Sequence, residues 1–328
     1  MSVFDKIGRL LTRTTTDSEF TTDGLPKTRV SDKPVQKVLE DIYTELRLHR
    51  EFLGQRKQSV ELVDNLGTSF GVERLGNVLK VFATNPGLEI ARGKVPGVSF
   101  IHKFGRNPDV GTATDPEDIW DGGGIWVAPT TARIHQITSS NAEDGAGTQT
   151  GALTLEVLGL DPLLHLKQQE LILNGQSNVA TLSFAIIYRM KVLTAGSTGR
   201  NVGIITATAD TDGTVTAQIN ATNNQTGMAI YQIPAGKTGY MTNFYGSLAD
   251  SGGVGANVDL QLLVQSLGGV FQVKQFHGLV ASGSAHFNHL FPILFPLEAK
   301  ETIKMQAKTT SASNANVSAG FDIILIDE

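Results

Sequence analysis

Residues 34–66 read PVQKVLEDIYTELRLHREFLGQRKQSVELVDNL and contain a heptad pattern. One series of positions spaced by seven holds Leu39, Leu46, Leu53 and Val60. The other series, set so that the gaps alternate between three and four, holds Val35, Ile42, His49, Arg56 and Val63. This spacing is typical of a coiled-coil seam, and leucine at a with a β-branched residue at d favours three or four strands over two. The stretch therefore predicts an oligomerising helix.

The start of this helix carries the usual signals, because Ser31 and Asp32 can cap it and Pro34 stands in its first turn. Tyr43 and Phe52 broaden the apolar face beyond a narrow seam, so a single helix that packs on its own chain is an open alternative. His49, at a d position, would make assembly sensitive to pH. The predicted oligomerisation residues are Val35, Leu39, Ile42, Leu46, His49 and Leu53.

Before the helix, residues 1–33 are polar and rich in threonine. A short amphipathic piece opens this arm, and its apolar residues Phe4, Ile7 and Leu11 are the predicted anchor contacts. We expect the arm to become ordered on another protein. A frayed terminus is the alternative.

After the helix the apolar period changes to two, which predicts strands. Phe184–Leu193 is the clearest, with Phe184, Ile186 and Tyr188 on one face. Gly196 and Gly199 mark a domain boundary. The fold class predicted is mainly β: an N-terminal coiled-coil-like helix, then two antiparallel sandwich or jelly-roll-like domains at 75–194 and 197–328. The last strand, Phe321–Ile326, is expected to be buried on both faces.

The strand candidates in the predicted first domain are 77–84, 98–104, 133–139, 154–158 and 184–193, while 161–173 fits a helix or a strand. Those in the predicted second domain are 203–208, 214–219, 228–233, 239–246, 258–265, 270–277, 302–308 and 321–326. Asp212-Gly213 and Gly268-Gly269 stand where hairpin turns need positive φ.

Composition excludes several classes of protein. The 328 residues contain no cysteine, so neither disulfides nor thiolate metal sites hold the fold. A net charge of −5 lacks the basic excess of a nucleic-acid binder. No apolar run is long enough for a secretion signal or a membrane span, so no membrane insertion is expected.

Three groups of residues invite a chemical interpretation. Gly236-Lys237-Thr238 lacks the earlier glycine of a phosphate loop, since Tyr231 stands there, and we interpret it as a hairpin turn. His277, His286 and His289 do not predict a metal site, because a metal needs three or four converging ligands and the spacing does not show that His277 converges with the other two. An odd offset places His286 and His289 on opposite faces of a strand.

Acidic residues gather at Asp109, Asp115, Glu117, Asp118 and Asp121. Loop carboxylates can bind calcium or act as an acid pair, but this spacing matches no regular calcium loop. The favoured interpretation is a solvated acidic loop closed by Trp120 and a run of glycines. No cofactor is expected, and the sequence predicts no catalytic residue.

Three stretches resemble virion proteins of tailed bacteriophages: 105–124, the run QTGMAIYQIPAGKTGYMT at 225–242, and VSAGFDIIL at 317–325. The resemblance extends over most of residues 75–328 and implies a structural role in the virion. Such proteins are generally not enzymes.

The function predicted is a homotrimeric fibre or spike-like protein. Its arm would hold it to the capsid, the portal-adaptor or the tail, and it would be made in the host cytoplasm and assembled into the virion. A capsid decoration protein is one alternative. A carbohydrate-binding module for a host surface glycan is another, and it would need Trp120, Trp126 and Tyr245 to form an exposed aromatic platform. A hydrolase that uses the acidic loop is the third.

Overall fold

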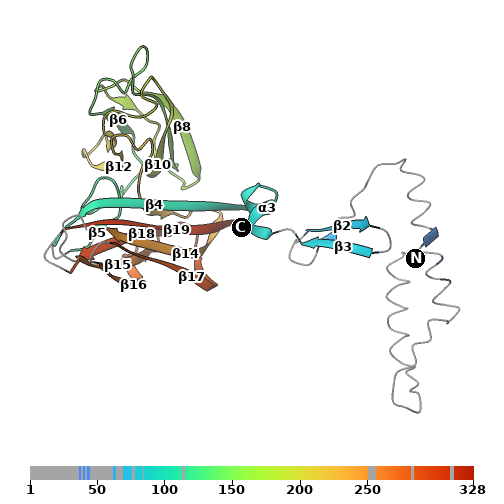
Figure 1. Ribbon diagram of the computed structural model, residues 1–328. Coiled ribbons are helices and arrows are strands. Elements are labelled where there is room, and N and C mark those ends of the chain that lie inside the picture. Colours follow the sequence, from blue (N-terminus) through green and yellow to red (C-terminus); the bar gives the residue numbers. More distant parts are fainter. Residues whose placement is uncertain are drawn as a thin grey trace. The chain divides into compact units, whose positions relative to one another are not determined.

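The computed structural model describes residues 85–112, 115–249, 256–281, 284–310 and 314–328, with shorter stretches before residue 84. The chain divides into two compact units, Met1–Asn85 and Pro86–Glu328. The described residues are mainly antiparallel strands (Figure 1). The mainly β character predicted from the apolar alternation is therefore confirmed.

The N-terminal unit contains a small antiparallel sheet in the order β1-β2-β3. Its strands are β1 (Leu62–Val63), β2 (Ser69–Leu75) and β3 (Val78–Ala83). Within the predicted oligomerising helix at 34–66, Lys37, Glu40, Tyr43 and Thr44 are helical and exposed, and no coiled coil is evident among the described residues. Leu62 and Val63 form the strand β1, so the prediction of a helix is wrong at those two residues. The predicted oligomerisation residues and the predicted anchor contacts lie outside the described residues.

The larger unit is built on two sheets of four main strands each. The first has the order β17-β14-β19-β4 and consists of β4 (Val98–Val110), β14 (Lys237–Ala249), β17 (Ser284–Leu297) and β19 (Ala315–Asp327). The second has the order β13-β18-β15-β16 and consists of β13 (Ile230–Gln232), β15 (Ala256–Gln265), β16 (Gln272–Ala281) and β18 (Thr302–Thr309). The short β5 (Glu117–Asp118) also pairs with β18, and the helix α3 (Pro86–Ala91) precedes β4.

These two sheets face one another, and their strands bury alternate residues, as a half-buried sheet does. Met241, Phe244 and Leu248 of β14 point inward, and all three are buried. Gly246 shares that face, where a Cβ would lie 2.7 Å from Leu260 Cδ2 of the opposite sheet. A side chain at Gly246 would therefore push the two layers apart.

The remaining strands, all between β5 and β13 in the chain, make two more sheets. They are β6 (His135–Ser139), β7 (Ala152–Leu160), β8 (Leu166–Ile172), β9 (Val179–Ala180), β10 (Ile186–Ala195), β11 (Ile205–Ala209) and β12 (Val215–Ile219). Their orders are β10-β7-β8 and β12-β11-β6-β9. We refer to residues 126–227 as the inserted body.

Strand pairing crosses the boundary that Gly196 and Gly199 suggest. β11 and β12 follow this boundary in the chain, yet β11 pairs with β6, which precedes it. Likewise β4 pairs with β19 near the other end of the chain. The segment that contains Gly196 and Gly199 therefore lies in a turn within the inserted body.

The two facing sheets are called the sandwich from here on. A two-stranded neck joins the inserted body to this sandwich. Trp120 and Met228 form an antiparallel bridge, and the Asp121 amide donates to the Gly227 carbonyl at 2.8 Å. The Gly227 amide in turn donates to Oδ2 of Asp121 at 2.6 Å. Burial raises the pKa of Asp121 to about 6. The body thereby leaves and re-enters the sandwich at one place.

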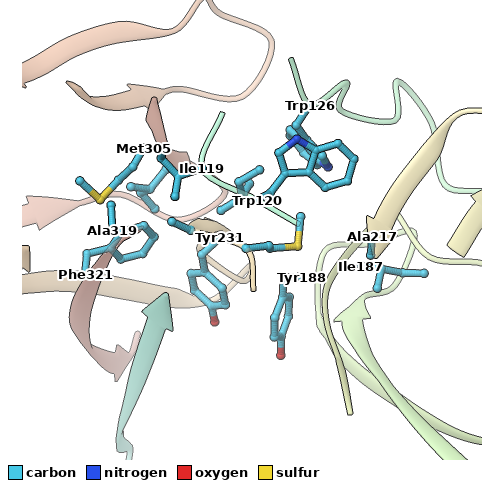
Figure 2. Packing of buried hydrophobic residues seen from close by; sticks show 14 of the residues in the cluster. Ile119, Trp120, Trp126, Ile187, Tyr188, Ala217, Tyr231, Met305, Ala319 and Phe321 are labelled. Atoms are coloured by element: carbon cyan, nitrogen blue, oxygen red, sulfur yellow. The ribbon is translucent and has the colours of Figure 1, made fainter. Parts of the chain in front are cut away.

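Aromatic side chains fill the space at the neck (Figure 2). Tyr188 from β10 meets Tyr231 from β13 edge to face, with ring centroids 4.9 Å apart. Trp120 and Trp126 are buried here as well, and the Trp126 indole donates to the Thr216 carbonyl. The hydrophobic core therefore runs continuously from the sandwich into the inserted body.

A buried ion pair lies beside the neck. Nζ of Lys304 on β18 is 3.0 Å from Oδ1 and 3.1 Å from Oδ2 of Asp118 on β5. The same carboxylate accepts the Trp126 amide at 2.8 Å, and the ammonium lies 4.4 Å from the ring centroid of Phe271. Desolvation raises the pKa of Asp118, and the charge of Lys304 opposes that rise. The start of the inserted body is thus tied to the sandwich.

Several local expectations can now be compared with the structure. The hairpins at Asp212-Gly213 and Gly268-Gly269 are confirmed, with φ of +73° at Gly213 and +74° at Gly268. The ambiguous segment at 161–173 contains the strand β8. Gly236 is in a turn, with φ of +71°, but this turn connects β13 and β14 of different sheets, so the hairpin interpretation is wrong.

The expectation for residues 321–326 is also wrong in one respect. Phe321, Ile323 and Leu325 are buried, whereas Ile324 is half-buried and Ile326 is exposed. Polar Asp322 shares the outer face with the two isoleucines. Only the inner face of β19 lies in the core.

We predict that Lys304→Met lowers the free energy of unfolding by about 3–5 kcal/mol, because it leaves the Asp118 carboxylate buried without its counter-ion. The double variant Asp118→Asn with Lys304→Met should recover a large part of this loss. Urea unfolding followed by tryptophan fluorescence measures both, since the only two tryptophans lie at the neck. Equal stability of the single variant and the wild type would contradict the prediction.

His135 predicts a pH dependence of stability. The ring is fully buried, and desolvation lowers its pKa against the smaller, opposing effect of the Arg133 backbone. The unfolded chain therefore binds a proton near pH 6.5 that the folded chain does not, so this residue destabilises the fold as pH falls below that value. Between pH 7.5 and 5.5 the wild type should lose about 1 kcal/mol more than His135→Phe. Parallel urea curves that shift equally with pH would refute this.

Candidate assembly surface

Two neighbouring edge strands leave one side of the sandwich open. β16 is the last strand of one sheet and β17 is the last strand of the other, and the two strands contact each other. Each has one backbone edge without a partner strand in the described residues, over 10 and 14 residues respectively. Such edges are ready to pair with another chain.

These strands lack the charged side chains that normally protect a sheet edge. β17 reads SAHFNHLFPILFPL and contains no charged residue, and Lys274 is the only one in β16. Pro292 and Pro296 remove two backbone donors from β17. The prolines limit simple strand addition, so the apolar side chains carry more of any association.

Large apolar side chains around this edge are exposed. Phe276, Val280, Leu290 and Ile293 are between 65% and 89% exposed. Val273 and Leu294 are less exposed members of the same two strands. We call these six residues the apolar edge.

A bulge in β17 produces the most exposed member of the apolar edge. Met241 of β14 pairs with Phe295, and Asn243 pairs with Leu290, so Thr242 alone stands opposite residues 291–294. The extra residues project from the sheet, and Ile293 among them is 89% exposed. A bulge re-aims side chains in this way at many functional sheet edges.

A cluster of rings fixes β17 in place behind the apolar edge. Phe244 of β14, which is buried, contacts Phe287, His289 and Phe291 with ring centroids 5.3, 5.1 and 5.8 Å away. His277 of β16 stacks on Phe287 at 3.8 Å. Phe287 and Phe291 remain half-buried, because no further strand covers them. The apolar edge therefore stands on a packed support.

The three histidines singled out in the sequence lie at this edge. His286 and His289 occupy opposite faces of β17, as the odd offset predicts, since His289 joins the ring cluster and His286 pairs across from Ser247 on the outer face. Among the described residues, no group of three or more histidine, aspartate or glutamate side chains could hold a metal ion.

Of the acidic residues at 109–121, Asp109 and Asp115 are exposed, but the interpretation of a solvated loop is wrong for Asp118 and Asp121. Asp118 and Asp121 are buried at the neck, where Lys304 and backbone amides offset their desolvation. Glu117 accepts the amides of Gly111 and Gly124. These carboxylates order the connections around the neck.

The aromatic platform required by the carbohydrate-binding alternative is not formed. Trp120 and Trp126 are buried at the neck, and only Tyr245 lies on an outer face. The indoles fill the core that the inserted body shares with the sandwich.

Sequence reasoning missed β17 altogether. Pro292 and Pro296 break the strand pattern, and the histidines drew attention to metal binding instead. The usable signal was a stretch of 14 residues without a charge that carries Phe287, Phe291 and Phe295.

Comparisons with known proteins give little further information. No protein-family model and no curated protein matches the chain. A solved structure of infectious bursal disease virus, strain Gt, is 9% identical, covers 71% of this chain and 73% of its own, and has a TM-score of 0.20. The crystal structure of the VP2 subviral particle of that virus is 12% identical, with coverages of 70% and 72% and a TM-score of 0.19. Scores this low carry no argument about the fold of this chain.

No helix among the described residues is long and apolar enough to cross a bilayer.

We predict that Leu290→Asp and Ile293→Asp change the free energy of unfolding of the monomer by less than about 0.5 kcal/mol, because both side chains are exposed. Phe244→Ala, in the supporting ring cluster, should cost about 3–5 kcal/mol. Urea unfolding at protein concentrations low enough to keep the chain monomeric tests both. A large loss in either aspartate variant would mean that the apolar edge stabilises the chain's own fold.

Proposed function

We propose that this chain is a non-enzymatic structural protein of a virion and that it assembles with copies of itself through the apolar edge. The observation that carries the proposal is the row of exposed apolar side chains on β16 and β17, where Lys274 is the only lysine, arginine, aspartate or glutamate.

A second copy of the chain is the occupant that fits this surface best. The net charge of −5 would repel an identical copy at most surfaces, but β17 carries no charge, so two such edges can approach without that cost. Apolar side chains on both partners would also be removed from water by such a contact.

The strand order supports the structural role. We propose that the eight main strands of the sandwich form a jelly roll, since in chain order they give sheets 6-3-8-1 and 2-7-4-5. Jelly rolls occur in viral capsid proteins, in lectins and in cupins. The inserted body would then be a long excursion between the first strand and the second.

The finer assignment is a homotrimeric fibre or spike of a tailed bacteriophage, held by residues 1–33 and trimerised by residues 34–66. Its support is the resemblance at 105–124, 225–242 and 317–325. In the structure these stretches contain the end of β4, the neck with β13 and the start of β14, and much of β19. They are therefore neighbours in the sandwich. A capsid decoration protein remains the second candidate, and locating labelled copies on intact particles distinguishes the two.

We predict that wild-type chain forms trimers, at three times 35.1 kDa, in light scattering after size exclusion. The double variant Leu290→Asp with Ile293→Asp should shift the chain to lower mass. Leu166→Asp with Ile172→Asp on β8 is the matched control, because those two leucine and isoleucine side chains are also at least half exposed but lie in the inserted body.

The helix is tested separately by Ile42→Asp with Leu46→Asp. Combining this change with the edge variant shows whether the helix alone holds the trimer together. If the edge variant leaves the mass unchanged both in the wild type and in the helix-disrupted chain, assembly through the apolar edge is wrong.

A further inference from the structure

A cavity of about 360 Å³ lies between α3 and the outer face of the sheet that contains β4 and β19. Its walls are largely apolar: Ile90 of α3, Phe100 of β4 and Ile324 of β19 line it. The cavity also reaches Thr242 of β14, but none of the residues that line it belongs to the apolar edge. It therefore uses residues other than those of the proposed assembly surface.

A carboxylate and an imidazole face this cavity together. His102 and Asp322 are cross-strand neighbours, and Nδ1 of the histidine contacts Oδ1 of the aspartate. Their side chains are 49% and 34% exposed, so solvent and ligands can reach them. An imidazole that donates Nδ1–H to a carboxylate presents its other nitrogen as an acceptor.

Tyr245 contacts the His102 imidazole at Nε2, the nitrogen that does not contact Asp322. Its hydroxyl is 3.3 Å from Nε2 of His102, and the two rings stack with their planes 15° apart. The tyrosine lies flat over Gly320, where a Cβ would be only 2.4 Å from its hydroxyl oxygen. The absence of a side chain at Gly320 therefore leaves room for the tyrosine ring. The contacts with Tyr245 and Asp322 hold the His102 imidazole in place without a ligand.

These groups favour one class of ligand. Among the residues that line the cavity there is no lysine or arginine, so no charge there would recognise an anion. The polar end presents acceptors, and one of them is a carboxylate. We propose that this cavity binds an organic ammonium with a small apolar body, the ammonium at Asp322 and the apolar part between Ile90, Phe100 and Ile324.

Binding fits this site better than catalysis does. Tyr, His and Asp in a row resemble a proton relay, but desolvation and the charge of Asp322 raise the pKa of Tyr245 to about 12. A phenol that stays protonated is a poor nucleophile or base at neutral pH. A cavity of a few hundred Å³, mainly apolar with a few convergent polar groups, has the usual character of a ligand site.

The test uses three probes of one shape: benzylammonium, benzyl alcohol and benzoate. We expect a dissociation constant on the order of 1 mM for benzylammonium, at least tenfold weaker binding of the alcohol, and no binding of benzoate. Binding is followed by the methyl NMR shifts of Ile90 and Ile324.

Three variants test whether benzylammonium binds in this cavity and at Asp322. Asp322→Asn keeps the size of the side chain and should reduce the affinity for benzylammonium at least tenfold. Ala91→Phe, at an exposed position of α3 on the cavity wall, should block benzylammonium and benzyl alcohol alike. Asp259→Asn, an exposed position on β15 in the other sheet, removes the same charge elsewhere and should change nothing.

The proposal is overturned if the methyl groups of wild-type chain do not shift with benzylammonium at tens of millimolar. It is equally overturned if Asp322→Asn and Asp259→Asn bind benzylammonium with the same affinity, or if benzoate binds as well as the amine does.

Discussion

The larger unit depends on one constraint, which is that β5 and β13 both pair with the same strand, β18. Between β5 and β13 the chain leaves the sandwich for more than a hundred residues, which form the inserted body. β5 and β13 pair with β18 at Ala307 and Ile303 respectively, while β15 pairs along its other side. The Asp118–Lys304 ion pair, which also receives the Trp126 amide, ties the outgoing chain to that strand. A buried charge pair of this kind adds modest stability when intact, yet losing one partner is costly. It specifies where the inserted body begins.

The two ends of the sandwich differ in how they meet solvent. At the neck, the buried carboxylates of Asp118 and Asp121 have partners, and a continuous core leads into the inserted body. At β16 and β17, apolar groups are exposed on a well-packed support. Rigidity behind an exposed apolar surface lowers the entropic cost of association, because the surface needs no reordering when a partner arrives. This contrast is why the proposed function rests on that edge.

Much of the strand content could be predicted from the sequence, since alternation reports directly on which face of a strand is buried. Phe184–Leu193 and the glycine turns at Gly213 and Gly268 are examples. The candidate site was not predictable in the same way. A proline at 292 or 296 argues locally against a strand, but a long bulge and an edge position accommodate both. Asp118 and Asp121 looked solvated because their neighbours in sequence are polar, whereas the partners that allow their burial are Lys304 and Gly227, far away along the chain.

By itself the sequence determined the period of its apolar residues, its lack of cysteine and the absence of charge in β17, since these are properties of the residues in order. Only the tertiary structure decided that β11 pairs back to β6, that β4 pairs with β19 and that the inserted body belongs between β5 and β13. Pairing over such distances depends on which edges and apolar faces are left free once other strands have packed. A local pattern, which states that a strand has a buried face, does not state which strand covers it.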